Sequence, residues 1–466
     1  MECIMRKGSS RFLVVAAASF VSAPAMATNG YFLHGYGAAS AAMGGVGYAL
    51  PQDGLAPAAN PAGITLVGDR FDIGIDWFIP RRGGSIEGNN SIAPLVNSGS
   101  VLGGGTSPTG PSANGDYDGN RKTNAYIPNL GYVTQINPKL SFGIALYGNG
   151  GLQTDYAQNP FAAFQLKGTP TNAGVNLEQL FVAPTLALRF SDHQSIGVSL
   201  NIVYQQFKAY GLQAFALDGY PTAQAPIVGP FSTAPDKVTD NGPDNSYGLG
   251  YRVGYLAEPF EGFTLGGSYQ PKIHMKRFSK YAGLFAGHGV FDVPENYGGG
   301  IAYRWRQTLI VSADVQRILY SDVSSVGNGL ESFVNGVKLG TDGGPGFGWR
   351  DMTIYKLGAA VQVSKPLLLR IGYSYGRQPV PDNQTLFNIL APGVIEQHFT
   401  AGAQFNLGNG YELNLSYLFA PEKTVYGHNS IPNGTVLDLP PKNFGGGEAN
   451  IHLKEQTVGL SLAVRF

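Results

Sequence analysis

Fourteen stretches of alternating residues, running from Arg70 to the end of the chain, constrain this sequence more than any motif does. The gaps between them are alternately long and short. In the last stretch, 453–466, Val458, Leu460 and Leu462 alternate with small or polar residues. Strands with one apolar and one polar face, joined by long loops and short turns in turn, are typical of a transmembrane β-barrel.

The expected strands are 70–80, 123–136, 139–148, 178–190, 194–208, 246–258, 262–278, 295–306, 308–319, 350–363, 366–377, 396–407, 410–420 and 453–466. We therefore predict an all-β fold, a 14-stranded antiparallel transmembrane β-barrel, with short periplasmic turns and long extracellular loops. The alternative is a soluble β-sandwich or barrel. Such folds need no aromatic girdle, whereas Phe, Trp and Tyr make up 12% of this chain and recur near the strand ends.

Residues 1–27 have the features of a secretory signal peptide. Basic residues precede an apolar stretch from Phe12 to Val21, and Ala25-Met26-Ala27 fits a small-residue cleavage site. Cys3, the only cysteine, lies in this segment, so we expect neither disulfides nor cysteine-ligated metal in the mature protein. The balanced charge suggests no nucleic-acid partner.

The segment 28–69, ahead of the barrel (70–466), is rich in Gly and Ala and is interrupted by three prolines. It has room for short helices only. Two fates are open to it, a disordered periplasmic tail or a plug inside the barrel. Its apolar residues favour the plug, because their exposure to water is costly.

Three motifs in this segment, in this order, carry a family resemblance. They are NGYFLHGYG (Asn29–Gly37), MGGVGYALPQD (Met43–Asp53) and NPAG (Asn60–Gly63). Together they resemble the hatch of the FadL family of outer-membrane transporters for long-chain fatty acids and other hydrophobic compounds, toluene-type hydrocarbons included.

The resemblance implies a monomeric fourteen-stranded barrel in a Gram-negative outer membrane, in contact with its lipid and lipopolysaccharide. Its N-terminal hatch has short helices and needs no cofactor. The hatch and gate residues expected here are Phe32, Asn60, Pro61 and Ala62.

Two of the long loops are unusually apolar for segments exposed to water. The residues expected to capture a hydrophobic ligand are Leu212, Phe215, Leu217, Leu284, Phe285 and Phe291. In the FadL family the corresponding loops form a hydrophobic groove for first binding. The alternative is that these side chains only pack the loops together over the barrel mouth.

Proline lies inside two expected strands, at Pro128 and Pro184, on either side of the third strand. Proline donates no ladder hydrogen bond, so we expect weak pairing on both sides of that strand. The third strand runs into Gly148 and Gly150, where a kink or bulge is predicted. The FadL family has an inward kink in this strand that opens a side window and contacts the hatch near the Asn-Pro-Ala motif. The alternative is two bulges without consequence.

A fatty-acid carboxylate inside the barrel requires a cation or several hydrogen-bond donors. Alternation directs Arg189 and the candidate anchors Arg252, Lys272, Arg304 and Arg370 toward the lumen. The alternative is that each is a solvated or paired lumen charge, with Asp314 and Glu412 as inward-facing partners.

Catalysis is not expected, since none of the seven histidines has the spacing of a metal pair or a serine–histidine relay. The sequence thus predicts passive transport of hydrophobic compounds, first of all long-chain fatty acids. Capture by loops, hatch movement and lateral release at strand three are the expected steps. Uptake of monoaromatic hydrocarbons, a general porin and a surface receptor, for an adhesion partner or a phage, stay open.

Overall fold

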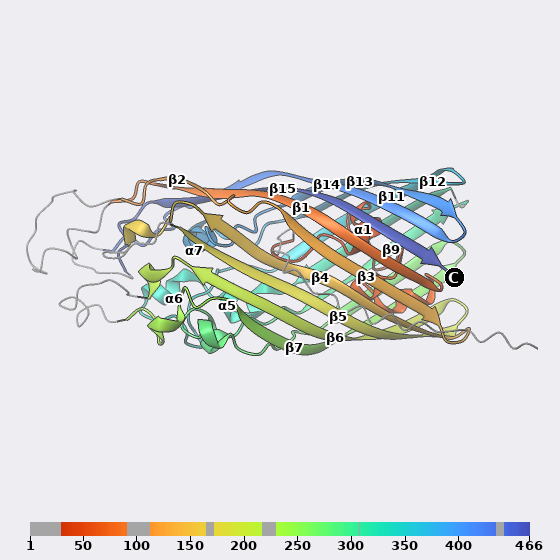
Figure 1. The fold of residues 1–466 in the computed structure, drawn as a ribbon, viewed down its shortest axis with the longest axis horizontal. Helices are drawn as coiled ribbons and strands as arrows, with labels where there is room; N and C mark the ends of the chain where they lie inside the picture. The colour runs from red at the N-terminus through yellow and green to blue at the C-terminus, as the bar shows by residue number, and fades with distance from the viewer. Residues whose placement is uncertain (1–28, 91–111, 165–171, 217–229, 307, 435–441) are drawn as a thin grey trace, which may run out of the picture.

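The computed structural model describes residues 29–90, 112–164, 172–216, 230–306, 308–434 and 442–466. They form one closed antiparallel barrel, in which each strand pairs with its sequence neighbours and the last strand pairs with the first (Figure 1). The strands are Arg70–Glu87 (β1), Gly115–Asp118 (β2), Ala125–Gln135 (β3), Leu140–Tyr156 (β4), Ala173–Ser191 (β5), Gln194–Tyr210 (β6), Asp244–Phe260 (β7), Phe263–Gln270 (β8), Asn296–Trp305 (β9), Leu309–Ile318 (β10), Met352–Ser364 (β11), Leu367–Gly376 (β12), Gln397–Gly408 (β13), Tyr411–Val425 (β14) and Glu448–Arg465 (β15).

The strand count agrees with the predicted fourteen, because β2 and β3 both pair with β1 and share one position in the wall. The short turns lie at one end of the barrel and the long connections at the other (Figure 1). Several strands extend further into the loop end than predicted. β1, for example, stays paired with β15 as far as Glu87.

The wall has the polarity of a membrane barrel. On β6, Ile196, Val198 and Leu200 point outward and are 44–47% exposed, whereas Ser199 and Asn201 point inward and are fully buried. A soluble barrel would have the opposite arrangement. Among the described residues, no helix is both long and apolar enough to cross a bilayer.

The described N-terminal segment, residues 29–69, lies inside the barrel and ends where β1 begins. It contains the helix α1 (Gly37–Ala41) and the 3-10 helices η1 (Ala56–Ala58) and η2 (Pro61–Thr65). Because α1 contacts β13–β15 and η2 contacts β4–β7, the segment reaches from one side of the wall to the other.

The long connections carry the remaining short helices. These are Ala162–Phe164 (η3), Gln213–Phe215 (η4), Pro235–Lys237 (η5), Ser279–Tyr281 (η6), Ala286–Gly289 (α4), Tyr320–Asp322 (η7), Ser324–Gly327 (α5), Leu330–Val334 (α6), Asp382–Gln384 (η8) and Thr385–Asn388 (α7). Figure 1 shows α5, α6 and α7 gathered at the loop end of the barrel. The largest group of buried apolar side chains lies largely among these loops and the adjoining strand ends.

Candidate functional site

An apolar cavity of about 50 Å³ lies among the loops. Four of the predicted capture residues line it, namely Leu212, Phe215, Leu284 and Phe285. The other lining residues were not predicted from the sequence; they are Val175, Phe207, Ser325, Leu339, Pro345, Gly346, Phe347, Phe387 and Leu390. They come from strands and loops far apart in the sequence, so only the fold brings them together. Leu217 lies outside the described residues.

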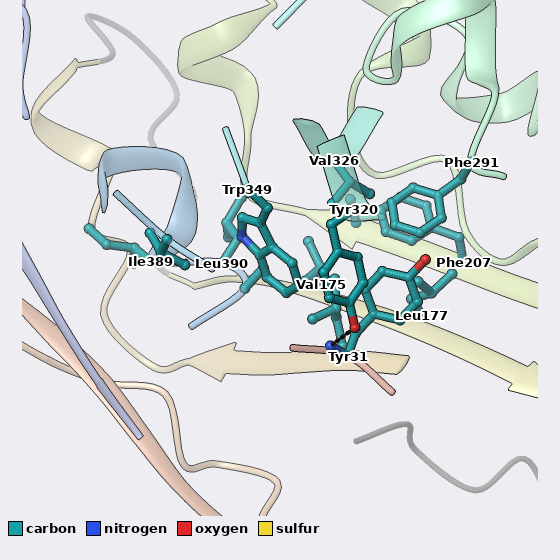
Figure 2. Close-up of a cluster of buried hydrophobic side chains, with 14 of the residues drawn as sticks. Tyr31, Val175, Leu177, Phe207, Phe291, Tyr320, Val326, Trp349, Ile389 and Leu390 are labelled. Carbon is teal, nitrogen blue, oxygen red and sulfur yellow. Dashed lines mark hydrogen bonds between the residues drawn. The ribbon is translucent and has the colours of Figure 1, made fainter. Parts of the chain in front are cut away.

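Aromatic rings lead from the cavity to the start of the N-terminal segment. The ring of Phe285 lies 5.1 Å from that of Phe291, which lies 5.8 Å from that of Tyr31. Tyr31 also packs against Tyr320 at 5.1 Å and Trp349 at 6.0 Å. Figure 2 shows this aromatic cluster with Tyr31 pointing into it. The predicted capture residue Phe291 therefore lies between the cavity and the N-terminal segment, and is not part of the lining.

A gap in strand pairing interrupts the wall beside this segment. The β3–β4 ladder stops at the pair Leu130–Leu146, although β4 continues to Tyr156 and stays paired with β5. Backbone pairing between the two sides resumes only at Asn120 and Asp155. Over that interval, β4 has no ladder with β3, and this gap in backbone pairing is called the side opening below.

The start of the N-terminal segment pairs with β4 at this opening. The amide of Leu33 donates to the carbonyl of Asn149 at 2.9 Å, and the amide of Gly151 donates to that of Tyr31 at 2.9 Å. A side chain on Gly150 would overlap the carbonyl oxygen of Tyr31. Glycine is required here because two backbones approach closely.

The glycines and prolines predicted to form a lateral gap lie at different kinds of irregularity. Gly148 and Gly150 flank a register shift between β4 and β5. Pro128 lies just beyond the end of the β3–β4 ladder and pairs with Ile75 of β1. Pro184 pairs normally with Ile144 of β4. The prediction that Pro184 weakens pairing of the third expected strand, which is β4, is wrong. The missing amide of Pro184 falls on the side of β6, where the β5–β6 ladder has no pairs between Val182 and Thr185.

Asn60 holds the part of the N-terminal segment around η2 in place through hydrogen bonds of its side chain. Its side-chain amide donates to the carbonyls of Tyr48 at 2.7 Å and Tyr255 at 2.9 Å, and its oxygen caps η2 by accepting from the amide of Ala62. Pro61 packs on β7, since a Cβ on Gly254 would lie 2.8 Å from its ring. The Asn-Pro-Ala motif therefore lies against β6 and β7, whereas the part of β4 with the register shift contacts Tyr31 and its neighbours. The fourth predicted gate residue, Phe32, forms a β-bridge with Gly150.

Asp53 is a buried carboxylate of the same segment. It accepts from the amide of Leu55 at 2.9 Å, and the amide of Gly54 donates to Asp72 of β1. Arg70 pairs with Asp72 at 2.6 Å. Burial, and then the neighbouring Asp72, raise the pKa of Asp53 to about 7.

The predicted carboxylate anchors separate into two groups. Arg252 and Arg370 are buried inside the barrel, at 2% and 8% exposure. Lys272 is half-buried and donates to the carbonyl of Asp322, and Arg304 is exposed near the β9–β10 turn. The second group therefore lies away from the interior.

Arg252 is a cation held by neutral partners. It donates to Ser268 at 3.3 Å, Gln270 at 2.9 Å and Asn296 at 3.1 Å. In the part of the chain that the structure describes, no carboxylate forms an ion pair with it, and its Nε atom has no hydrogen-bond acceptor. Arg370 is similar, with Gln404 at 2.5 Å and Asn414 at 3.1 Å.

Two expected acidic partners bind other groups. Asp314 accepts from the amides of Gly47 and Tyr48 in the N-terminal segment. Glu412 pairs with Arg70 and with Arg465 at 2.7 Å. Over the described ranges, no group of three or more His, Cys, Asp or Glu residues is arranged to hold a metal ion.

Comparison with known proteins identifies the family. Residues 14–433 match the family described as "Outer membrane protein transport protein (OMPP1/FadL/TodX)". The chain belongs to this family. It is therefore a Gram-negative outer-membrane barrel of a family of transport proteins.

Curated relatives match a smaller part. The long-chain fatty acid transport protein of Escherichia coli O157:H7 is 29% identical over 169 residues, 33% of this chain and 35% of that protein. That of Salmonella typhi is 28% identical over 160 residues, 33% of this chain and 34% of that protein. The matched region thus spans about a third of these relatives.

Solved structures share the fold at low identity. The toluene transporter TodX of P. putida is 18% identical with a TM-score of 0.62, over 93% of this chain and 99% of that one. A Pseudomonas aeruginosa FadL homologue is 15% identical with a TM-score of 0.63, over 94% of this chain and 100% of that one.

Proposed function

We propose that this protein carries hydrophobic compounds passively across the outer membrane and releases them sideways into the bilayer. The observation that carries the proposal is the side opening between β3 and β4, with the N-terminal segment paired to its β4 edge. A hydrophobic solute gains nothing from an aqueous channel, because water solvates it poorly. An exit through the wall avoids that barrier.

The route begins at the loops. The cavity lined by Phe215 and Phe285 offers apolar surface at the loop end, and the cluster around Tyr31 separates it from the opening. The N-terminal segment acts as a hatch that must move before a ligand passes. An interior filled by this segment argues against a general porin.

Long-chain fatty acids are the proposed substrates, with monoaromatic hydrocarbons as the second candidate. Arg252 favours the first, because a buried guanidinium with only neutral partners can bind a carboxylate with charge-assisted hydrogen bonds. The second candidate is supported by the cavity lining, which contains no charged side chain. We propose a monomer, in contact with outer-membrane lipid and lipopolysaccharide.

Uptake of labelled oleate and labelled toluene tests the proposal, in cells that lack their own FadL-type protein and express this chain. Faster oleate uptake alone establishes a fatty-acid transporter. Faster toluene uptake alone assigns the hydrocarbon role and makes Arg252 structural. No gain for either, with the folded barrel shown in the membrane, contradicts the proposal.

A further inference from the structure

The N-terminal segment is fastened to the wall opposite the side opening by polar groups of four neighbouring strands. Lys356 of β11 donates to the carbonyls of His34 and Gly45, both at 3.1 Å. Thr400 of β13 accepts from the amide of Gly44 at 2.9 Å, and Asp314 of β10 accepts from two further amides. All these contacts are buried.

A pair of buried histidines lies within this contact. His34 belongs to the segment and His398 to β13, and their rings are 4.6 Å apart. The hydroxyl of Ser374 on β12 bridges them, at 3.2 Å from Nδ1 of His34 and 3.1 Å from Nδ1 of His398. The exposed fractions of the two histidines are only 2% and 1%, so water screens any charge there weakly.

The hydrogen bonds between Ser374 and the two histidine rings are compatible with both rings being neutral. A hydroxyl carries one proton, so Ser374 can donate to one bare Nδ1 and accept from the Nδ1–H of the other ring. A further proton on the pair leaves the hydroxyl with no ring nitrogen to donate to. It also places a positive charge beside the second ring and near Lys356.

The charged groups around the pair make this proton costly. Lys356 on β11 and His398 on β13 face His34, and Asp314 on β10 lies beyond Lys356, already engaged by two amides. Burial first, and then His398 and Lys356, hold the pKa of His34 well below its usual range. The fastened segment is therefore favoured when His34 is neutral. The docked state of the segment loses stability as the pH drops below the ordinary histidine pKa of about 6.5 toward the lowered pKa of His34.

We infer that the His34–His398 pair is a proton-sensitive latch, which releases the N-terminal segment from the wall at mildly acidic pH. His34 directly follows Leu33, whose amide pairs with Asn149 of β4. Movement of His34 is thus transmitted to the pairing that occupies the side opening. Any effect on transport rests on the proposed function, in which this segment obstructs passage.

Hydrogen exchange tests the latch without reference to transport. The full mature chain in lipid nanodiscs is exchanged at pH 7.5, 6.5 and 5.5, and rates in peptides covering 29–50 are corrected for the intrinsic pH effect. Uptake of one proton increases exchange by up to about tenfold per pH unit below 6.5. The double variant His34→Asn/His398→Asn should lose this response. His193→Asn is the matched control, since His193 is exposed in the β5–β6 turn.

Wild-type protection that does not fall from pH 7.5 to 5.5 relative to that of the folded double variant overturns the latch. The comparison removes the opposite pH dependence of Asp53, which both proteins share. If that variant does not fold, the single variant His398→Asn serves, and a wild-type response in it overturns the pairing. Uptake of a neutral hydrocarbon by proteoliposomes that contain the same proteins separates the two proposals. Release of the segment without faster uptake supports the latch and contradicts the obstructing role of the segment.

Discussion

Gly150→Ala is the substitution that most directly disturbs the contact between the N-terminal segment and the side opening. Its added methyl group would overlap the carbonyl oxygen of Tyr31 and lie 3.0 Å from Cα of Phe32. Gly150 does not have a left-handed conformation, so alanine is otherwise compatible with its backbone. The effect should therefore come from the contact alone.

The magnitude follows from the two hydrogen bonds that the separation breaks, Leu33 to Asn149 and Gly151 to Tyr31. At about 1 kcal/mol each, their loss costs about 2 kcal/mol. This corresponds to a roughly 30-fold increase in the detached population. We expect faster exchange of the Leu33 and Gly151 amides, and a faster initial uptake of a hydrophobic substrate.

Gly267→Ala on β8 is the matched control, because its new methyl group would meet nothing closer than a carbonyl oxygen 3.4 Å away. It should leave exchange and uptake as in the wild type. Wild-type exchange at Leu33 and Gly151 in a folded Gly150→Ala barrel would refute the reasoning.

Three further substitutions test other parts of the account. Asn60→Ala removes three hydrogen bonds, to Tyr48, Tyr255 and the η2 cap, and should destabilise the docked segment by about 2–4 kcal/mol, measured by exchange of its amides. Asp53 has a raised pKa of about 7, so its contribution to docking should weaken as pH rises from about 4 to 7, opposite to that of His34; relative to the wild type, Asp53→Asn should remove this contribution in the same assay. Arg252→Gln should slow oleate uptake roughly 10–100-fold and leave toluene uptake unchanged, and equal loss of both would remove its role as an anchor.

The barrel could be predicted because side-chain alternation follows directly from a wall between lipid and a polar interior. The prediction failed where the side chains alternate but the backbone forms no ladder. The stretch 262–278 alternates throughout, but β8 ends at Gln270. Beyond Pro271, Ile273 and Met275 are buried by packing over β7 and form only isolated bridges. Alternation reports which side chains share a face; it reports neither whether that face is buried nor whether the backbone is hydrogen-bonded.

Residues of the site could be predicted only where several of them lie in one short apolar segment of the sequence. The apolar loops indicated Phe215 and Phe285, whereas Tyr320 and Trp349 come from a connection without a comparable apolar run. Lys356 was missed, although it alternates with outward-facing neighbours on β11, as Arg252 does on β7 and Arg370 on β12. Strand register decides which neighbouring strand loses a hydrogen bond at a proline, and the sequence does not specify that register.

Closing the side opening with a disulfide tests the central claim most directly. A Cβ on Gly148 would lie 2.7 Å from Cγ2 of Ile127, so Ile127→Cys/Gly148→Cys places two thiols within bonding reach across the opening. Ile301→Cys/Ala313→Cys on the intact β9–β10 ladder is the control pair. The account predicts that oxidation of the first pair abolishes uptake, that reductant restores it, and that the control pair has no effect. Equal uptake by the oxidised and reduced forms of the first pair would contradict lateral release.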